Sequence, residues 1–404
     1  MKKILTVFVL FLMTVSIYTQ ERSIFPVKSR TVEFGLAEVH AGFANNFISA
    51  SKIFRETAVI DLDEFKNGFL FNLDVSASPI TFNFNKNDIW GFGISTKTEA
   101  SGIMELSGKM LNLQQIADEK STIGGSIFAE ARVGGFFTIN KFKLKFKPAL
   151  YYPLMVVVPD ISYTFKDVDD KPFLSMDYNL TVWTVFPYDS FMDDINLTAN
   201  PGVDFYFGLE YPLAKAIGLS DKIKILDFGL GLDLYNIPLV PSTLKNYMNI
   251  SGHYGSDEPI NIDILEFDFN SFLDSQFTMD SKTEYGTGNK PVFRPFKMLA
   301  RADWRPLGTE LLTIYPSIGF SLNPYYLHLF SIESGIKARV NMLNFFLASV
   351  GIGYEDRLWK NSIDLAINLR AFELDMGIDM RSQKILRSWS AAGLGAFFGL
   401  KFGW

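Results

Sequence analysis

Apolar and polar residues alternate along most of this chain. The stretch 202–211 reads GVDFYFGLEY, and the stretch 226–234 reads LDFGLGLDL. Successive side chains of a β-strand point to opposite faces, so each stretch predicts a strand with one apolar face and one polar face. The pattern recurs at 69–77, 90–94, 127–133, 142–146, 161–165, 174–182, 298–304, 312–322, 332–340, 346–354 and 363–369.

The number and length of these segments indicate their surroundings. Roughly fourteen or fifteen segments of about 10 residues alternate, and about 10 residues is what a tilted strand needs to cross a bilayer. Strands of soluble proteins average about 5–6 residues. In lipid, a closed barrel leaves no ladder edge unpaired, and its apolar face needs no covering layer. We therefore predict an all-β fold, a transmembrane antiparallel up-and-down β-barrel of about 14–16 strands; a soluble secreted β-protein is the alternative.

The composition of the 404 residues argues against several classes of function. A net charge of −6 does not fit a nucleic-acid partner, which would need a basic patch. The absence of cysteine removes disulfides, thiolate metal sites and cysteine nucleophiles. The three histidines are scattered, and neither a G-x-S-x-G nor an H-E-x-x-H motif is present. We therefore expect no cofactor, no metal, no nucleic acid and no catalytic residues, in a protein that is not an enzyme.

The first segment has the pattern of an export signal. Lys2 and Lys3 precede an apolar run at 4–15, and small and polar residues then lead to Glu21 and Arg22. This order, with a run too short for a good membrane span, predicts a cleaved signal peptide over 1–20. An N-terminal membrane anchor is the alternative. No later apolar run approaches the about 20 residues of a spanning helix.

The remaining chain divides into an N-terminal segment, 21–67, and the barrel, 68–404. Both ends of such a barrel should lie in the periplasm, so its strand number should be even. Residues 21–67 either plug the lumen or supply a first strand near 32–43. The stretch 236–291 is expected to be a large outer loop, with eight acidic residues and three lysines. It folds into the pore, caps it, or extends two strands above the membrane.

One segment between two predicted strands has a different period. Its apolar residues recur at helical spacing, which predicts a short amphipathic helix over the barrel mouth. They are Ile103, Leu106, Met110, Leu113 and Ala117.

The last strand carries the most specific signal. The chain ends with an aromatic residue, and apolar residues precede it at alternate positions: Phe398, Leu400, Phe402 and Trp404. This ending resembles the C-terminal β-signal of bacterial outer-membrane barrels, although the usual last residue is Phe. The resemblance implies that these four residues are read by the barrel assembly machinery.

A second resemblance concerns the barrel as a whole. The stretch 35–46, GLAEVHAGFANN, resembles the N-terminal plug region of the fatty-acid-transport (FadL-type) family, whose barrels have about 14 strands. The asparagine-proline-alanine motif of that family is absent. The resemblance implies an apolar ligand that leaves sideways through the wall.

The polar faces of the predicted strands hold the candidate functional residues. Rows of charge around a water-filled pore set which ions pass, whereas cross-strand pairing alone would have no role in selectivity. The lumen-lining candidates are Lys143, Lys145, Lys147, Asp204, Glu210, Asp227, Asp233, Arg301, Lys337, Arg339, Glu373, Asp375 and Asp379.

Together these features predict an outer-membrane channel or passive transporter for small solutes, polar or apolar. Its partners would be outer-membrane lipid, the assembly machinery and the solute. A non-conducting surface barrel whose outer loops bind a partner is the alternative hypothesis, and a barrel-embedded hydrolase is the least favoured one. The oligomeric state and the solute stay open at this point.

Overall fold

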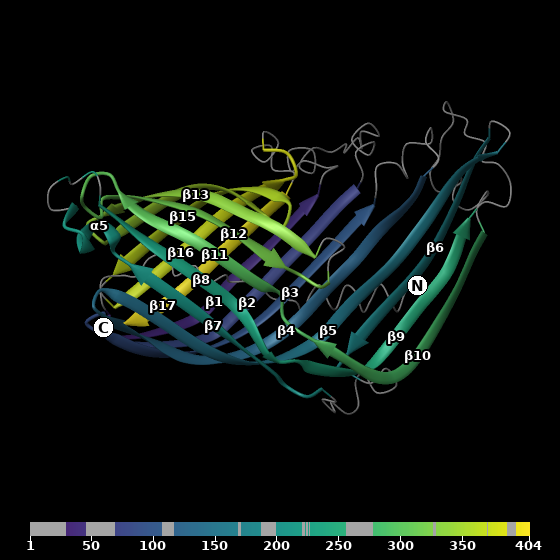
Figure 1. Ribbon diagram of the computed structural model, residues 1–404, viewed down its shortest axis with the longest axis horizontal. Helices are drawn as coiled ribbons and strands as arrows, with labels where there is room; N and C mark the ends of the chain where they lie inside the picture. Colours follow the sequence, from purple (N-terminus) through teal and green to yellow (C-terminus); the bar gives the residue numbers. More distant parts are fainter. Residues whose placement is uncertain are drawn as a thin grey trace.

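A computed structural model describes residues 30–45, 69–106, 117–168, 171–186, 199–219, 223, 225, 227–255, 278–325, 329–369, 371–385 and 393–404. These residues form one antiparallel sheet of seventeen strands (Figure 1). The strands are β1 (Val32–Asn45), β2 (Phe69–Lys86), β3 (Trp90–Leu106), β4 (Ala117–Ile139), β5 (Phe142–Val168), β6 (Lys171–Thr184), β7 (Gly202–Tyr211), β8 (Asp227–Val240), β9 (Ser242–Gly255), β10 (Thr278–Val292), β11 (Phe296–Arg305), β12 (Leu312–Leu322), β13 (Phe330–Met342), β14 (Phe346–Glu355), β15 (Leu358–Leu369), β16 (Phe372–Ser382) and β17 (Gly393–Gly403). One short helix, α5 (Leu213–Ala216), follows β7. Among the described residues, no helix is long and apolar enough to cross a membrane.

The sheet closes into a ring of fourteen strand positions. Three positions each hold two consecutive strands: β6 with β7, β8 with β9, and β10 with β11. β5 pairs with β6 along one half and with β7 along the other, and β8 and β9 pair in turn with β11 and β10. The ring closes where β1 lies between β17 and β2, with Glu33 opposite Gly403. The predicted all-β antiparallel barrel of 14–16 strands is therefore confirmed.

The two faces of the wall differ as the alternation requires. Large apolar side chains are exposed on one face of nearly every strand, as in the row Trp90, Phe92 and Ile94 on β3. The opposite faces carry the buried charged side chains. A continuous exposed apolar band around a closed ladder is the surface of a barrel that spans a bilayer, because lipid covers it and no backbone group is left unpaired.

The two ends of the barrel are built differently. At one end, called here the turn end, turns of two or three residues join neighbouring strands at 87–89, 140–141 and 343–345, and the first two residues of each turn have positive φ. Such turns match the twist of the strands that they join. The described chain ends also lie here, where the Thr31 N–H donates to the Trp404 carbonyl at 2.8 Å.

At the far end, one side of the wall rises well above the other. β11 to β17 have 10 to 13 residues each, whereas β4 and β5 have 23 and 27. β4, β5, β6, β9 and β10 therefore form an outer extension, which Figure 1 shows projecting from the barrel. Among the described strands, β9 is the only partner of β10, so the other edge of β10 ends the sheet there.

Prolines mark the level at which the extension begins. Pro241 separates β8 from β9, Pro295 lies between β10 and β11, and Pro153 stands at a register shift between β4 and β5. Proline lacks the N–H that a ladder needs, so it interrupts pairing. Between these breaks and the turn end, every neighbouring pair in the ring is joined by ladder pairing.

Two segments expected from the sequence, 21–67 and 236–291, contain strands in the structure. Of the segment 21–67, residues 32–45 form the wall strand β1; the rest of it, like the signal peptide 1–20, lies outside the described residues. The expected loop 236–291 instead contains the end of β8, all of β9 and all but the last residue of β10; residues 256–277 lie outside the described residues. This matches the alternative of two strands extended above the membrane.

The helix predicted from Ile103 to Ala117 is wrong where the structure describes it. β3 continues through Ile103 to Leu106, and β4 starts at Ala117; Met110 and Leu113 lie outside the described residues. Ile103 does not belong to the apolar face of a helix. It packs inside the barrel against Ala44 and Leu70, so the helical spacing of these apolar residues is a coincidence.

The lipid-facing band gives the first prediction. Val350 is exposed midway along β14, so Val350→Arg should lower the free energy of unfolding by about 2–4 kcal/mol in lipid vesicles, since arginine is costly at the bilayer midplane. Thr283→Arg, an exposed site on the outer extension, is the control and should cost under about 1 kcal/mol. Denaturant titration of the refolded protein measures both; equal costs would contradict the placement of the band.

Candidate functional site

The inner face of the barrel brings the sequence-selected charges into contact with one another. Lys145 binds Glu210 at 2.6 Å, and Arg301 bridges Glu210 and Asp233. The buried hydroxyl of Tyr206 donates to Asp233 at 2.5 Å. Of the flanking lysines, Lys143 lies 4.2 Å from the centre of the Phe136 ring, and Lys147 lies 5.6 Å from that of Tyr206.

The remaining candidates lie on the same face in smaller groups. Lys337 binds Asp364 at 2.5 Å, and Ser349 donates to the same carboxylate at 2.9 Å. The guanidinium of Arg339 lies 5.0 Å from the Tyr315 ring centre, and Asp227 contacts Arg305 at 3.8 Å near the turn end.

Lys401 gathers the acidic candidates of β16. Its ammonium lies 3.0 Å from Asp375, 3.5 Å from Glu373 and 3.7 Å from Glu38 of β1. These side chains come from the neighbouring strands β16, β17 and β1, and Glu373 and Asp375 are two of the lumen-lining candidates.

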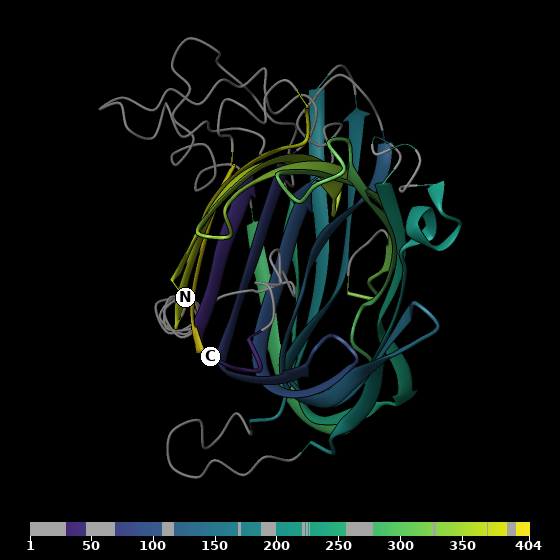
Figure 2. The same ribbon diagram turned by 90° about the vertical axis from the view of Figure 1, so that its left-hand side faces the viewer.

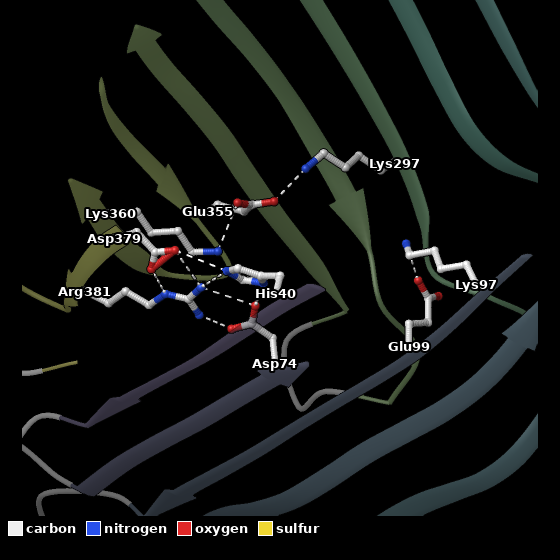
Figure 3. Close-up of polar contacts among 9 residues, drawn as sticks. All are labelled: His40, Asp74, Lys97, Glu99, Lys297, Glu355, Lys360, Asp379 and Arg381. Carbon is white, nitrogen blue, oxygen red and sulfur yellow. Dashed lines mark hydrogen bonds and ion pairs between the residues drawn. The ribbon is translucent and has the colours of Figure 1, made fainter. Parts of the chain in front are cut away.

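A second cluster crosses the seam where the first strand meets the last. Arg381 of β16 forms ion pairs with Asp379 on its own strand and with Asp74 of β2, although β17 and β1 lie between them. His40 contacts both carboxylates at 3.3 Å, as Figure 3 shows. Arg381 reaches this position because Gly42 has no side chain, and a Cβ there would lie under 3 Å from the guanidinium.

Lys297 of β11 starts a third cluster, which joins strands near the far end. Lys297 bonds to Glu355 at 2.7 Å and to Glu333 at 2.5 Å, and Lys360 completes the group at 3.0 Å from Glu355 (Figure 3). Charges taken out of water are tolerated only when they are paired, so these clusters hold neighbouring and next-neighbouring strands in one arrangement.

The fourth cluster crosses the interior at the level of the strand breaks, and we call it the transverse charge layer. It consists of Lys97, Glu99, Glu130, Arg132, Asp204 and Arg294. Arg294, between β10 and β11, donates to Asp204 of β7 at 2.6 and 2.5 Å and also pairs with Glu130 of β4. β4 stands four ring positions from β11, so Arg294 spans a chord of the barrel. Three cations and three anions leave the layer without net charge.

An apolar cluster lies against this layer and points into the barrel. The Phe128 ring lies 6.1 Å from the Tyr151 ring, edge to face, and 6.0 Å from the Tyr325 ring, which is tilted against it. Val156, Val185, Leu244 and Val292 complete the cluster. Tyr151 also lies 5.2 Å from the Arg294 guanidinium, which joins the two layers. All seven side chains are nearly inaccessible to solvent. We call this group the mouth cluster.

The opposite side of the mouth also holds a buried apolar cluster with an ion pair beside it. The turn between β14 and β15 places Leu358 against Ala44, Leu70 and Ile103, all of them buried. Beside it, Arg357 binds Glu105 of β3 with two bonds of 2.9 and 2.7 Å. Apolar groups and a bridging ion pair thus approach the interior from both sides.

Some of these residues were not selected from the sequence. His40, Asp74, Lys97, Glu99, Glu130 and Arg381 were passed over because none of them belongs to a row of several like charges on one strand. The usable signal was the i, i+2 pairs of opposite charge, Lys97 with Glu99 and Glu130 with Arg132, which share one face of a strand.

The described fold defines an outer-membrane-type β-barrel with a closed wall and a charged interior. No protein-family model and no curated protein matches the chain. Among solved structures, the toluene transporter TbuX from Ralstonia pickettii is 9% identical over 93% of this chain and 90% of that chain, with a TM-score of 0.43. A deletion mutant of the monoaromatic hydrocarbon channel TodX is 10% identical over 97% and 96%, with a TM-score of 0.46. These similarities are too distant to argue function, which must come from the chain itself.

The seam cluster gives the second prediction. Arg381→Met should lower the free energy of unfolding by about 3–5 kcal/mol, because Asp74 and Asp379 would keep buried charges without their partner. Lys282→Met breaks an exposed pair with Glu284 and should cost under about 1 kcal/mol.

Denaturant unfolding in vesicles measures both variants. Adding Asp74→Asn and Asp379→Asn to Arg381→Met should recover part of the loss, because the unpaired charges are then gone. No recovery would show that the loss comes from packing around Gly42 rather than from charge.

Proposed function

We propose that this protein is a passive channel of the bacterial outer membrane for small apolar solutes. The observation that carries the proposal is the mouth cluster: buried aromatic and aliphatic side chains stand inside a barrel whose other inner positions are largely charged. A diffusion pore for polar solutes needs only a polar, wet lumen. The partly buried side chains of Leu154, Trp183 and Phe186, which pack against this cluster, instead provide a surface on which an apolar solute can leave water.

The route would run from the outer extension toward the turn end. On the inner face of the extension, Trp183 and Tyr247 lie with ring centroids 4.9 Å apart, directly beyond the mouth cluster. A solute would pass these rings, then the mouth cluster, then the transverse charge layer. The lumen-lining candidates from Lys143 to Asp379 would line the lower part of this route.

The transverse charge layer would act as the barrier to ions. Its charges are paired with one another, and the apolar groups beside it disfavour a continuous column of water. A small apolar solute does not need to carry a hydration shell through this point. The sideways exit implied by the fatty-acid-transport resemblance finds no support, since the described ladder pairs every neighbouring position between the breaks and the turn end.

Three further parts of the proposal rest on sequence and surface. Export would use the signal peptide 1–20. Insertion would use the outward row Phe398, Leu400 and Phe402, which belongs to the lipid-facing side of β17, together with Trp404, which is exposed at the end of the chain. The chain would act without a cofactor and without catalysis.

The mouth cluster gives the third prediction. In vesicles with lipopolysaccharide in the outer leaflet, the wild-type protein should speed the uptake of toluene several-fold and leave glucose uptake near background. Leu244→Trp and Val292→Trp should each reduce toluene uptake, because the packed cluster has no room for the larger ring and its neighbours are pushed into the route. Ile318→Trp on the lipid face is the matched control and should change nothing. Equal acceleration of glucose would identify a polar diffusion pore instead.

The transverse charge layer gives the fourth prediction. The triple variant Glu130→Gln, Asp204→Asn, Arg294→Met removes Arg294 together with both of its anionic partners. Arg132 loses its ion pair with Glu130 but keeps its hydrogen bond to the Asn236 side chain. Its single-channel conductance in a planar bilayer should exceed that of the wild type, because the bridging ion pairs that close the chord are gone.

One observation favours the alternative function. The outer extension exposes a broad sheet with an edge strand, a surface that could bind a partner outside the cell. A folded wild type that neither conducts nor speeds toluene uptake, with a triple variant that also stays silent, would reject the channel and favour that surface role.

A further inference from the structure

A patch of exposed apolar side chains lies at the turn end, beside the wall rather than inside it. We call it the rim patch: Ile217, Ile223, Ile225, Leu307 and Leu311, each about half exposed or more. The first three belong to the connection from β7 to β8, which includes α5, and the last two belong to the turn from β11 to β12. Turns at this end of a barrel are usually short, so a longer connection with exposed apolar side chains is unusual and suggests a function.

The two segments of the rim patch are neighbours. β8 and β11 pair from Asp227 opposite Arg305, so the residues just before β8 lie beside the residues just after β11. The indole N–H of Trp304 donates to the Ile225 carbonyl at 2.8 Å and ties the two segments together. Figure 2 shows α5 outside the ring of strands.

The rim patch continues the lipid-facing band. Trp304 and Leu230 are exposed on the outer faces of β11 and β8, directly next to the patch along the strands. Tryptophan whose ring is apolar and whose N–H is bonded is the usual residue of a membrane interface. On the same rim, Trp404 is 72% exposed and Leu343 is 97% exposed, which places the edge of the bilayer at this level around the barrel.

A positive charge beside the rim patch fits phospholipid headgroups. Lys215 is exposed in the last turn of α5, two residues from Ile217. A short amphipathic segment with apolar side chains on the membrane side and cations beside them lies in the interface plane and attracts anionic lipid.

We propose that the rim patch is an interfacial anchor, which lies in the headgroup region of the leaflet at the turn end and holds an anionic phospholipid beside Lys215. The anchor widens the footprint of the barrel in that leaflet on the β8–β11 side. It is independent of whether the lumen conducts, so it can be tested on a folded barrel of any activity.

The absence of cysteine in the chain makes the test clean, since one introduced cysteine carries the only label. Ile217→Cys is labelled with an environment-sensitive fluorophore, and the protein is refolded into phosphatidylcholine vesicles containing lipids with a nitroxide near the headgroup or deep in the acyl chain. Ile318→Cys on the lipid face is the buried-in-lipid control, and Lys282→Cys on the outer extension is the aqueous control.

The headgroup nitroxide should quench the label at 217 at least about twofold more than the deep nitroxide, whereas position 318 should show the reverse order. Position 282 should be quenched by neither. Replacing part of the phosphatidylcholine with phosphatidylglycerol should blue-shift the emission at 217, and Lys215→Gln should remove most of that shift.

Three results would overturn the proposal. A label at 217 that behaves like the one at 282 would place the rim patch in water. A label shielded from water yet unquenched by either nitroxide would mean that protein covers the patch, and loss of shielding on dilution in lipid would identify a second copy. An emission that ignores phosphatidylglycerol would remove the anionic-lipid site.

Discussion

Every part of this molecule depends on the requirement that a backbone in hydrocarbon must pair all of its polar groups. An unpaired N–H or carbonyl in lipid costs several kcal/mol, so a sheet can cross only as a closed ring. The pairing of β1 with β17 satisfies that requirement, because it closes the sheet into a ring. The seventeen strands occupy fourteen positions in this ring, because three positions hold two strands each. The prolines that interrupt β8, β10 and their neighbours stand where the ring is already complete toward the turn end. The strands are thus interrupted at these prolines, while the wall between the prolines and the turn end stays closed by ladder pairing.

The same ring creates a second problem, because a barrel of this size has an interior that must be filled or wet. Here many inward charges are paired across two or more strand positions, as Arg381 with Asp74 and Arg294 with Glu130. Small residues such as Gly42 leave the space in which a long guanidinium can cross. The wall and its filling therefore form one structure. At the mouth, partly buried apolar side chains such as Trp183 pack on the buried cluster and replace the charged filling with a surface that an apolar solute can contact.

The fold could be predicted from the sequence because a strand in lipid repeats with a period of two, and a stretch such as 202–211 carries that period without help from its neighbours. The face of each charged residue follows from the same period, so Lys145, Glu210 and Arg301 were placed on polar faces in advance. The contacts between charged residues were not predictable from the sequence. Arg294 and Glu130, for example, are distant in the chain, and their contact can be predicted only once the ring position and register of their strands are known. The strands β9 and β10 were mistaken for a loop because their serine, threonine, asparagine and glycine residues resemble loop composition.

The seam between β1 and β17 also sets the order in which the molecule can form. Residue 33 pairs with residue 403, so this pairing closes nearly the whole chain into one loop. The conformational entropy lost on closing so long a loop makes this the last pairing to form. Until then two long strand edges are open to pairing with any other chain. Once the seam forms, Arg381 lies across it from inside, bonded on both sides through Asp379 and Asp74. An ion pair that appears only after the last strand has joined slows opening without helping closure, so the finished barrel is expected to persist through a slow rate of unfolding more than through a fast rate of folding.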